Sequence, residues 1–189
     1  MNPFSIRDTL PADAAAVLEY LKMLAEEPDI PLNLEPDCVK VSVAEEEKLL
    51  AGILEADNAI YRLAEAEAGG EIIGILSCRG LTRMMAPQLV RHVAELGLSV
   101  RRDWRGKGVG TALMEDAIAW ARASCFITRL QLEVYTTNTS AIRLYERLGF
   151  VHEGRRRHAI KRGGKYIDTY TMALLWDEAH AAQAEDTAD

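Results

Sequence analysis

The sequence predicts one α/β domain, in which helices cover both faces of a mixed β-sheet of about seven strands. Two observations support this fold class. Segments of alternating hydrophobicity, typical of strands, are interspersed with segments of helical apolar periodicity in the order βααβββαβαββ. In addition, a chain of 189 residues that is 49% hydrophobic and 27% charged is long and apolar enough to form one core. We expect the domain to span residues 1–176, followed by an acidic, alanine-rich tail at 177–189.

The first quarter of the chain reads as a strand followed by two helices. Phe4–Arg7 is a short strand candidate, and residues 14–27 carry apolar side chains on one helical face. Three prolines then predict an irregular loop over residues 28–40. Ser42 and Glu45 have the spacing of a capping box, which predicts a second helix from there to about residue 56.

The middle of the chain reads as three strands. Residues 59–66 and 71–79 are extended candidates joined by a glycine-containing hairpin. Residues 81–90 are ambiguous, although Pro87 favours a loop. Residues 92–100 alternate between apolar and polar or small side chains, which predicts a half-buried strand.

The last part of the chain alternates strands with one short helix. A strand is predicted at 130–135, and Asn138 is an N-cap candidate for a helix that ends at Gly149. Residues 150–160 and 165–175 form a final hairpin candidate around the sequence Lys-Arg-Gly-Gly.

A glycine-rich segment links the strand ending at Val100 to a helical pattern that begins near Val109. The start of a helix presents unpaired backbone N–H groups and the positive end of a dipole. Glycines let that backbone approach an anion closely, and Arg105 and Lys107 add positive charge. The segment therefore predicts a phosphate-binding loop. It is neither a Walker loop nor a dinucleotide fingerprint, whose third glycine position is occupied by Thr111.

The spelling Arg105-Gly-Lys-Gly-Val-Gly110 resembles the pyrophosphate loop of the GNAT superfamily of acyl-CoA-dependent N-acetyltransferases. A second run, Asn138-Thr-Ser-Ala-Ile-Arg-Leu-Tyr-Glu-Arg-Leu-Gly-Phe150, is similar to that superfamily's Asn-x-x-Ala-x-x-Leu-Tyr-x-x-x-Gly-Phe segment. The resemblance covers residues 4–175 and is most specific over 95–150. It implies a mostly antiparallel sheet with a central splay. The ending after Gly154 looks most similar to the phosphinothricin and amino-acid N-acetyltransferase branch.

The resemblance implies transfer of an acetyl group from acetyl-CoA, as co-substrate, to a primary amine. It assigns coenzyme binding to the end of the strand, to the loop and to the cap of the short helix. These residues are Leu98, Ser99, Val100, Arg105, Gly106, Lys107, Gly108, Val109, Gly110, Thr111 and Asn138. Asn138 is equally explained as an N-cap alone.

Two side chains are the catalytic candidates. A primary amine is mostly protonated at neutral pH and must lose a proton before it attacks, so a base is required. Glu95 matches a carboxylate position of the phosphinothricin-type enzymes, and we expect it to be that base; His92 or a water relay is the alternative. Tyr145 is the acid candidate by resemblance. The structural alternatives are a solvated strand glutamate and a core tyrosine.

The acceptor itself is not identified by the sequence. A basic stretch around Arg155 and Arg157 on the last hairpin, with His92 and Tyr166, is the candidate acceptor-binding set for a carboxylate-bearing small amine. Three alternatives stay open: a solvated hairpin, acetylation of a protein N-terminus or lysine, and a non-catalytic CoA-binding regulatory module.

Composition sets further expectations. A formal net charge of −7 disfavours non-specific nucleic-acid binding. No apolar run approaches the ~20 residues of a membrane span, and the N-terminus lacks a signal-peptide layout. The three cysteines and four histidines show neither disulfide nor zinc spacing. We therefore expect a cytoplasmic enzyme without a metal. Homodimers are frequent in the superfamily, so an edge hairpin pairing across an interface is also expected by analogy.

Overall fold

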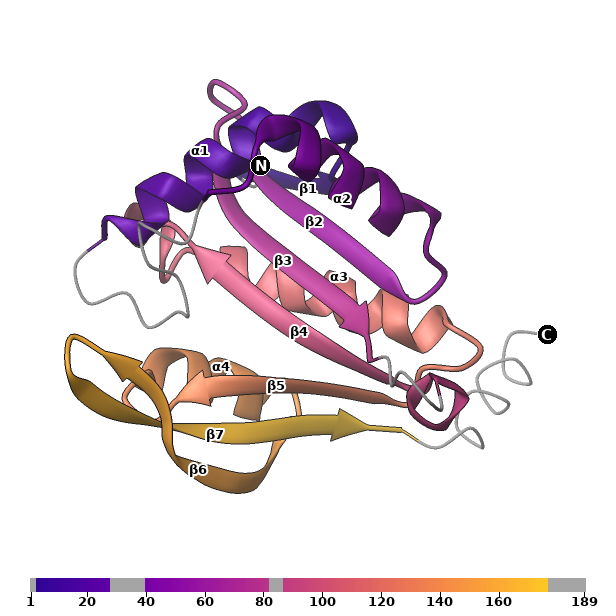
Figure 1. The fold of residues 1–189 in the computed structure, drawn as a ribbon, viewed down its shortest axis with the longest axis vertical. Helices are drawn as coiled ribbons and strands as arrows, with labels where there is room; N and C mark the ends of the chain where they lie inside the picture. The colour runs from indigo at the N-terminus through magenta and orange to yellow at the C-terminus, as the bar shows by residue number, and fades with distance from the viewer. Residues whose placement is uncertain (1–2, 28–39, 82–86, 177–189) are drawn as a thin grey trace. The chain divides into compact units, whose positions relative to one another are not determined.

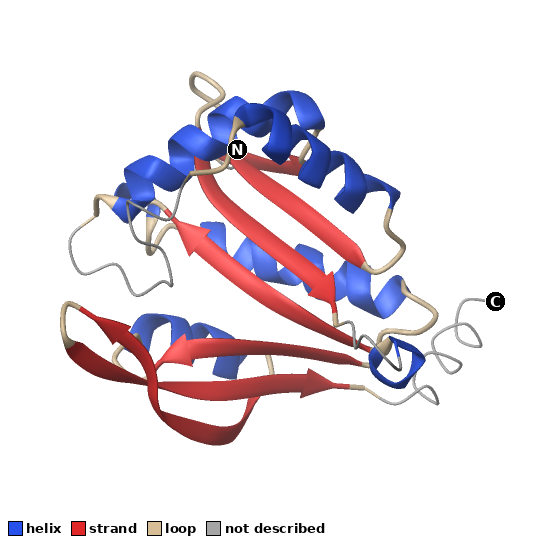
Figure 2. Cartoon of the chain, in the orientation of Figure 1, coloured by secondary structure: helices blue, strands red, loops and turns tan. Residues whose placement is uncertain are grey.

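A computed structural model of the chain describes residues 3–27, 40–81 and 87–176 (Figure 1). The chain forms two compact units, one made of Met1–Cys78 with Gly97–Ala117 and the other of Arg79–Leu96 with Ile118–Asp189. Strand β4 and helix α3 each contribute residues to both units. Figure 2 shows the strands and helices along the chain. They are β1 Phe4–Asp8, η1 Pro11–Asp13, α1 Ala14–Ala25, α2 Val43–Glu55, β2 Ala59–Ala66, β3 Ile72–Gly80, η3 Pro87–Val90, β4 Val93–Val100, η4 Arg102–Trp104, α3 Val109–Ala123, β5 Arg129–Tyr135, α4 Thr139–Arg147, β6 Val151–Arg162 and β7 Lys165–Leu175.

The element boundaries agree with the sequence predictions to within one or two residues for every strand and helix. The described strands form a seven-stranded sheet in the order β1-β2-β3-β4-β5-β7-β6, which confirms the mixed α/β fold class. The ambiguous segment 81–90 contains a 3₁₀ turn at its end, Pro87–Val90. The predicted loop at 28–40, apart from Lys40, and the predicted tail at 177–189 lie outside the described residues.

Strands β4 and β5 pair in parallel, whereas β1–β2, β5–β7 and β6–β7 are antiparallel. The β4–β5 ladder joins Val93–Glu95 to Arg129–Gln131. It therefore uses only the first part of each strand, since β4 runs to Val100 and β5 runs to Tyr135. The splay of the sheet stays a prediction.

Strand β3 is covered on both of its faces in the first unit, and its residues 72–76 are all buried. On one face, α1 packs against β2 and β3 through a cluster of buried side chains, in which the Tyr20 hydroxyl is the one polar group. The cluster consists of Val17, Tyr20, Leu24, Leu63, Ile72 and Ile75. On the other face, Gly74 lies under the first turns of α3. A Cβ atom at this position would come within 3.1 Å of Val109 Cγ1 and of Leu113 Cδ1, and within 3.3 Å of the Ser99 carbonyl oxygen. Glycine is what lets α3 approach the strand this closely.

The predicted capping box of α2 is present. The Glu45 N–H donates to Ser42 Oγ at 3.3 Å, and the Ser42 N–H donates to Glu45 Oε2 at 2.8 Å. Each side chain thus satisfies a backbone donor that the helix itself leaves unpaired. Among the described residues, no helix is long and apolar enough to cross a bilayer.

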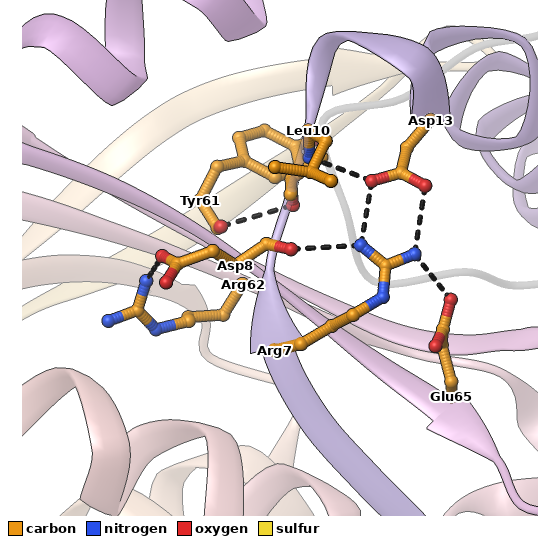
Figure 3. A network of polar contacts seen from close by, with 8 residues as sticks. Arg7, Asp8, Leu10, Asp13, Tyr61, Arg62 and Glu65 are labelled. Carbon is orange, nitrogen blue, oxygen red and sulfur yellow. Dashed lines mark hydrogen bonds and ion pairs between the residues drawn. The ribbon is translucent and has the colours of Figure 1, made fainter.

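A network of charged side chains ties β1 to its surroundings in the first unit (Figure 3). The Arg7 guanidinium donates two parallel hydrogen bonds to the Asp13 carboxylate, at 2.7 and 2.8 Å, and a third at 2.5 Å to Glu65. Asp13 also accepts the Leu10 N–H at 2.7 Å. The hydrogen bonds from Arg7 and the Leu10 amide hold the pKa of Asp13 below its ordinary value, although partial burial opposes them.

The second unit contains strands β5, β7 and β6 and helix α4, together with the first half of β4 and the end of α3. β6 is the edge strand, and residues 151–158 are exposed. The β6–β7 register shifts between Arg156 and Ile160, where His158 adopts a left-handed backbone with φ of 54°. Cys78 of the first unit is a buried free thiol whose pKa burial raises to about 12, whereas Cys125 is free and exposed.

We expect Asp13→Asn to lower the free energy of unfolding by about 1 kcal/mol at pH 7, because the bidentate pair with Arg7 is partly exposed. The folded-state pKa of Asp13 is depressed, so its contribution is present above the unfolded-state value and is lost as the pH falls through the folded-state value. Urea unfolding at pH 7 and pH 3 measures this. If the difference in unfolding free energy between wild type and Asp13→Asn does not decrease at pH 3, the pairing of Asp13 with Arg7 does not contribute as described.

We expect Gly74→Val to destabilise the protein by about 1–3 kcal/mol, because its side chain must displace the first turns of α3. Gly52, an exposed glycine of α2 with nothing within 4 Å of a Cβ, provides the matched control. Gly52→Val should be close to neutral, since valine is at least as good a helix former as glycine. Equal urea midpoints for Gly74→Val and Gly52→Val would show that α3 does not pack tightly against β3 at Gly74.

Candidate active site

The predicted phosphate-binding loop joins β4 to α3 through the short turn η4. Gly106 and Gly108 have φ of 74° and 87°, which is left-handed backbone that favours glycine. Both are exposed, as is Lys107, whereas Val109 at the start of α3 is buried. A long helix of 15 residues therefore begins immediately after a glycine turn. This is the geometry in which backbone N–H groups can bind an anion.

The cations of this segment are held by carboxylates and by the backbone. Arg105 Nε donates to the Val100 carbonyl at 2.9 Å, and a terminal nitrogen of Arg105 pairs with Glu27. Arg101 pairs with Glu71 and with Asp103, the latter at 2.8 Å.

Lys107 lies over the Trp104 ring with its Nζ 4.9 Å from the centroid. Sequence reasoning missed Glu27, which is 78 positions from Arg105 and has no local signal that links it to the loop.

Glu95 lies on β4 at the last residue pair of the parallel ladder, opposite Gln131. Its exposed carboxylate accepts a hydrogen bond from Gln131 Nε2 at 3.3 Å. The Gln131 side-chain oxygen in turn accepts from Arg129 Nε at 3.1 Å, and Arg129 binds the Glu153 carboxylate at 2.7 and 2.5 Å. The candidate base is thus oriented by an amide that is itself fixed by an arginine. Gln131 was not anticipated from the sequence.

His92, the alternative base, is exposed and directly precedes β4. Its carbonyl oxygen accepts the amide hydrogens of Thr128 and Arg129 at 3.0 and 3.1 Å. The backbone of His92 therefore anchors the start of β5, while its side chain lies three positions before Glu95. The structure places both base candidates on the same stretch of chain.

Tyr145 is a buried residue of α4, 7% exposed, with its ring centroid 6.0 Å from that of Phe150. Burial raises the pKa of its phenol to about 12, so the hydroxyl keeps its proton at neutral pH. Asn138 is the N-cap of the same helix: its Oδ1 accepts the Ala141 N–H at 3.2 Å. This confirms the capping prediction, and its role toward a coenzyme stays a prediction.

The basic stretch on β6 is partly neutralised by its own sheet. Arg155 pairs with Asp168 at 2.7 Å, and Arg156 pairs with Glu133. Asp168 also accepts the His158 N–H at 2.8 Å, which together with Arg155 keeps its pKa low. Arg157 is exposed.

At the tip of the hairpin, Tyr166 stacks on His158 with ring centroids 4.3 Å apart and an interplanar angle of 8°. The Lys161 ammonium also lies over the Tyr166 ring, 5.6 Å from its centroid. All four acceptor candidates are exposed, but Arg155 and Tyr166 also have partners within the hairpin. Across the described part of the chain, no group of three or more His, Cys, Asp or Glu side chains is placed to hold a metal ion.

Comparisons with known proteins agree with this arrangement. Residues 24–150 match the model of the acetyltransferase (GNAT) family. The chain is 37% identical over 84 residues to the L-amino acid N-acetyltransferase AaaT of Escherichia coli K12, an alignment that covers 44% of this chain and 52% of that protein. The chain thus spans about half to two thirds of the length of the first curated relatives it matches.

Solved structures extend the similarity to nearly the whole chain. A GNAT-family acetyltransferase from Streptococcus pneumoniae is 34% identical with a TM-score of 0.84, and the match covers 92% of this chain and 99% of that one. A phosphinothricin acetyltransferase from Sinorhizobium meliloti, solved in complex with AcCoA, shares the fold at 24% identity and a TM-score of 0.74, covering 93% and 90% of the two chains. The resemblance noted in the two sequence motifs is confirmed, and the chain belongs to the acetyltransferase (GNAT) family.

Proposed function

We propose that the protein transfers an acetyl group from acetyl-CoA to the primary amine of a small molecule, with an amino acid or an amino-acid analogue as the favoured class of acceptor. One observation carries the proposal: a left-handed glycine turn at Gly106 and Gly108 opens a long helix directly after β4, within a chain of the acetyltransferase family. The free thiols of Cys78 and Cys125 suit a reducing cytoplasm.

Coenzyme binding would use backbone more than side chains. Amides from Gly106 to Thr111 at the start of α3 would bind the pyrophosphate, assisted by Lys107, which is exposed. The backbone of Leu98–Val100 continues β4 past the end of its ladder with β5, and it would bind the pantetheine arm. Asn138 caps α4 and stands in the position that the family places at the coenzyme.

The chemistry would be direct attack in a ternary complex. The amine nitrogen bonds to the thioester carbonyl carbon, the carbon–sulfur bond breaks, and the electron pair leaves with sulfur. Glu95, oriented by Gln131, would accept the proton that the nitrogen loses, directly or through water. Tyr145 would donate a proton to the departing thiolate, and its protonated state at neutral pH suits that role.

The relatives support small amines as acceptors. Their names describe acetylation of L-amino acids in Escherichia coli and of L-methionine sulfoximine and sulfone in Pseudomonas aeruginosa. Arg155, Arg156 and Arg157 are all exposed, but Arg155 already binds Asp168 and Arg156 already binds Glu133. We therefore assign Arg157 the acceptor carboxylate.

A second candidate function is acetylation of a protein N-terminus. It is favoured by a 31% identity over 112 residues to an N-alpha-acetyltransferase of Sulfurisphaera tokodaii, covering 57% of this chain and 65% of that protein. A panel of free amino acids and N-terminal peptides distinguishes the two. Acetylation of the peptides alone would replace the small-molecule proposal with this one.

The first measurement is a calorimetric titration with acetyl-CoA, repeated in the presence of ATP. We expect saturable binding that ATP does not displace, because the pantetheine arm adds contacts that a nucleotide lacks. An absence of binding by folded protein at millimolar acetyl-CoA would overturn the enzyme proposal.

We further expect Glu95→Gln to lower kcat by about 100-fold with little change in the KM for acetyl-CoA, since a general base contributes roughly that factor. Tyr145→Phe should lower kcat about tenfold, because the ring remains and only the proton donor is lost. Glu115→Gln, an exposed α3 carboxylate, and Tyr170→Phe serve as controls. A variant that retains wild-type kcat would remove its residue from the mechanism.

A further inference from the structure

Helix α1 and the turn that ends it touch the predicted coenzyme segment at three points, all within the first unit. Tyr20 Oη donates to Ser99 Oγ at 3.0 Å. Glu27 Oε1 accepts the backbone N–H of Arg102 at 3.0 Å, and Glu27 Oε2 pairs with the Arg105 guanidinium. The contacts are spread along the end of β4, the η4 turn and the beginning of the glycine loop, at residues 99, 102 and 105.

Tyr20 lies within α1, whereas Glu27 lies two residues past the end of the helix at Ala25. The turn that ends the helix is fixed by its backbone: the Glu26 N–H donates to the Lys22 carbonyl at 3.3 Å, and the Glu27 N–H donates to the Leu24 carbonyl at 3.1 Å. These hydrogen bonds connect Glu27 to the last turn of α1.

Both side chains are well shielded from water. Tyr20 is 1% exposed, and burial raises the pKa of its phenol, so the hydroxyl remains a hydrogen-bond donor. The Glu27 side chain is 14% exposed. A carboxylate removed from water to this degree is stabilised only while its partners stay in place, so the Arg102 amide and the Arg105 guanidinium are held with it.

Arg105 is thereby fixed at two of its three nitrogens, since its Nε donates to the Val100 carbonyl while one terminal nitrogen pairs with Glu27. These contacts lock the turn between the end of β4 and Gly106. The side chain remains 41% exposed. In this arrangement Arg105 connects the loop to the turn that ends α1.

We propose that Tyr20 and Glu27 are positioning residues for the coenzyme, which hold Ser99, the Arg102 amide and Arg105 in the geometry that binds the pantetheine and pyrophosphate groups. This inference rests on the proposed function. It adds that α1, which contributes no residue to the glycine motif, determines the affinity of that motif.

The direction in which a substitution of Glu27 changes the affinity for acetyl-CoA distinguishes a positioning role from a purely electrostatic one. Removing a negative charge near a phosphate site strengthens anion binding if the charge acts only through space. Removing a residue that organises the site weakens it. We expect Glu27→Ala to raise the Kd and KM for acetyl-CoA about tenfold with kcat at saturation nearly unchanged. The adjacent, exposed Glu26 supplies the matched control, and Glu26→Ala should leave affinity unchanged or slightly stronger.

A measurement on the unliganded protein tests whether Glu27 positions the loop, even if the proposed function is wrong. Hydrogen exchange of the unliganded protein should be faster at residues 99–110 in Glu27→Ala than in Glu26→Ala, with the β1–β2 amides unchanged. If wild type does not bind acetyl-CoA, the proposed function falls, and the exchange result still decides whether α1 holds the loop. Equal exchange, or an acetyl-CoA affinity in Glu27→Ala equal to or above that of Glu26→Ala, would overturn the inference.

Two further variants locate the effect. Tyr20→Phe keeps the buried ring and removes only the hydrogen bond to Ser99, so we expect about a threefold rise in the KM for acetyl-CoA. In an Arg105→Gln background, Glu27→Ala should have a smaller effect than in wild type, because part of its action passes through Arg105. Full additivity of the two substitutions would show that Glu27 does not act through the arginine.

Discussion

The close approach of α3 to β3 at Gly74 is the constraint on which the rest of the site depends. With no side chain at this position, the first turns of α3 rest directly on the strand, and Val109 and Leu113 are buried there. This contact fixes where the helix begins, and hence where its unpaired N–H groups point. The left-handed turns at Gly106 and Gly108 then bring the chain from β4 to that starting point. A binding site made of backbone amides needs such a support, because a backbone N–H group cannot reorient unless the chain itself moves.

The charges around this backbone site are arranged in pairs. Arg101, Arg105 and Lys107 would give a strongly positive loop in an extended chain, yet each has a partner in the folded protein: Glu71 and Asp103, Glu27, and the Trp104 ring respectively. The pairing fixes the turn and reduces the local excess of positive charge. Selectivity for one ligand over other phosphates would then depend on geometry more than on charge.

Local patterns predicted most of the architecture because they carry their own physical signal. The capping box at Ser42, the glycine hairpins and the alternation in β4 each determine a backbone conformation within a few residues. The pairing of the glycine loop with Glu27, and of Glu95 with Gln131, was not predictable in this way. Arg105 and Glu27 are 78 positions apart, and Glu95 and Gln131 are 36 positions apart. Nothing in the sequence around such a glutamate or glutamine distinguishes a paired side chain from a solvated one. The bulge between Arg156 and Ile160 was missed for a related reason, because no glycine marks the left-handed residue His158.

That bulge affects how the molecule behaves in a crowded solution. β6 is the exposed edge of the sheet, and a straight edge strand can recruit the strands of other chains by hydrogen bonding. Here the edge carries three successive arginines and then departs from regular pairing at His158. Like charges and an irregular backbone both oppose strand addition along that stretch. A second register shift, between His152 and Gly154, interrupts the pairing before the arginines, so little of this edge offers a regular ladder to the strand of another chain.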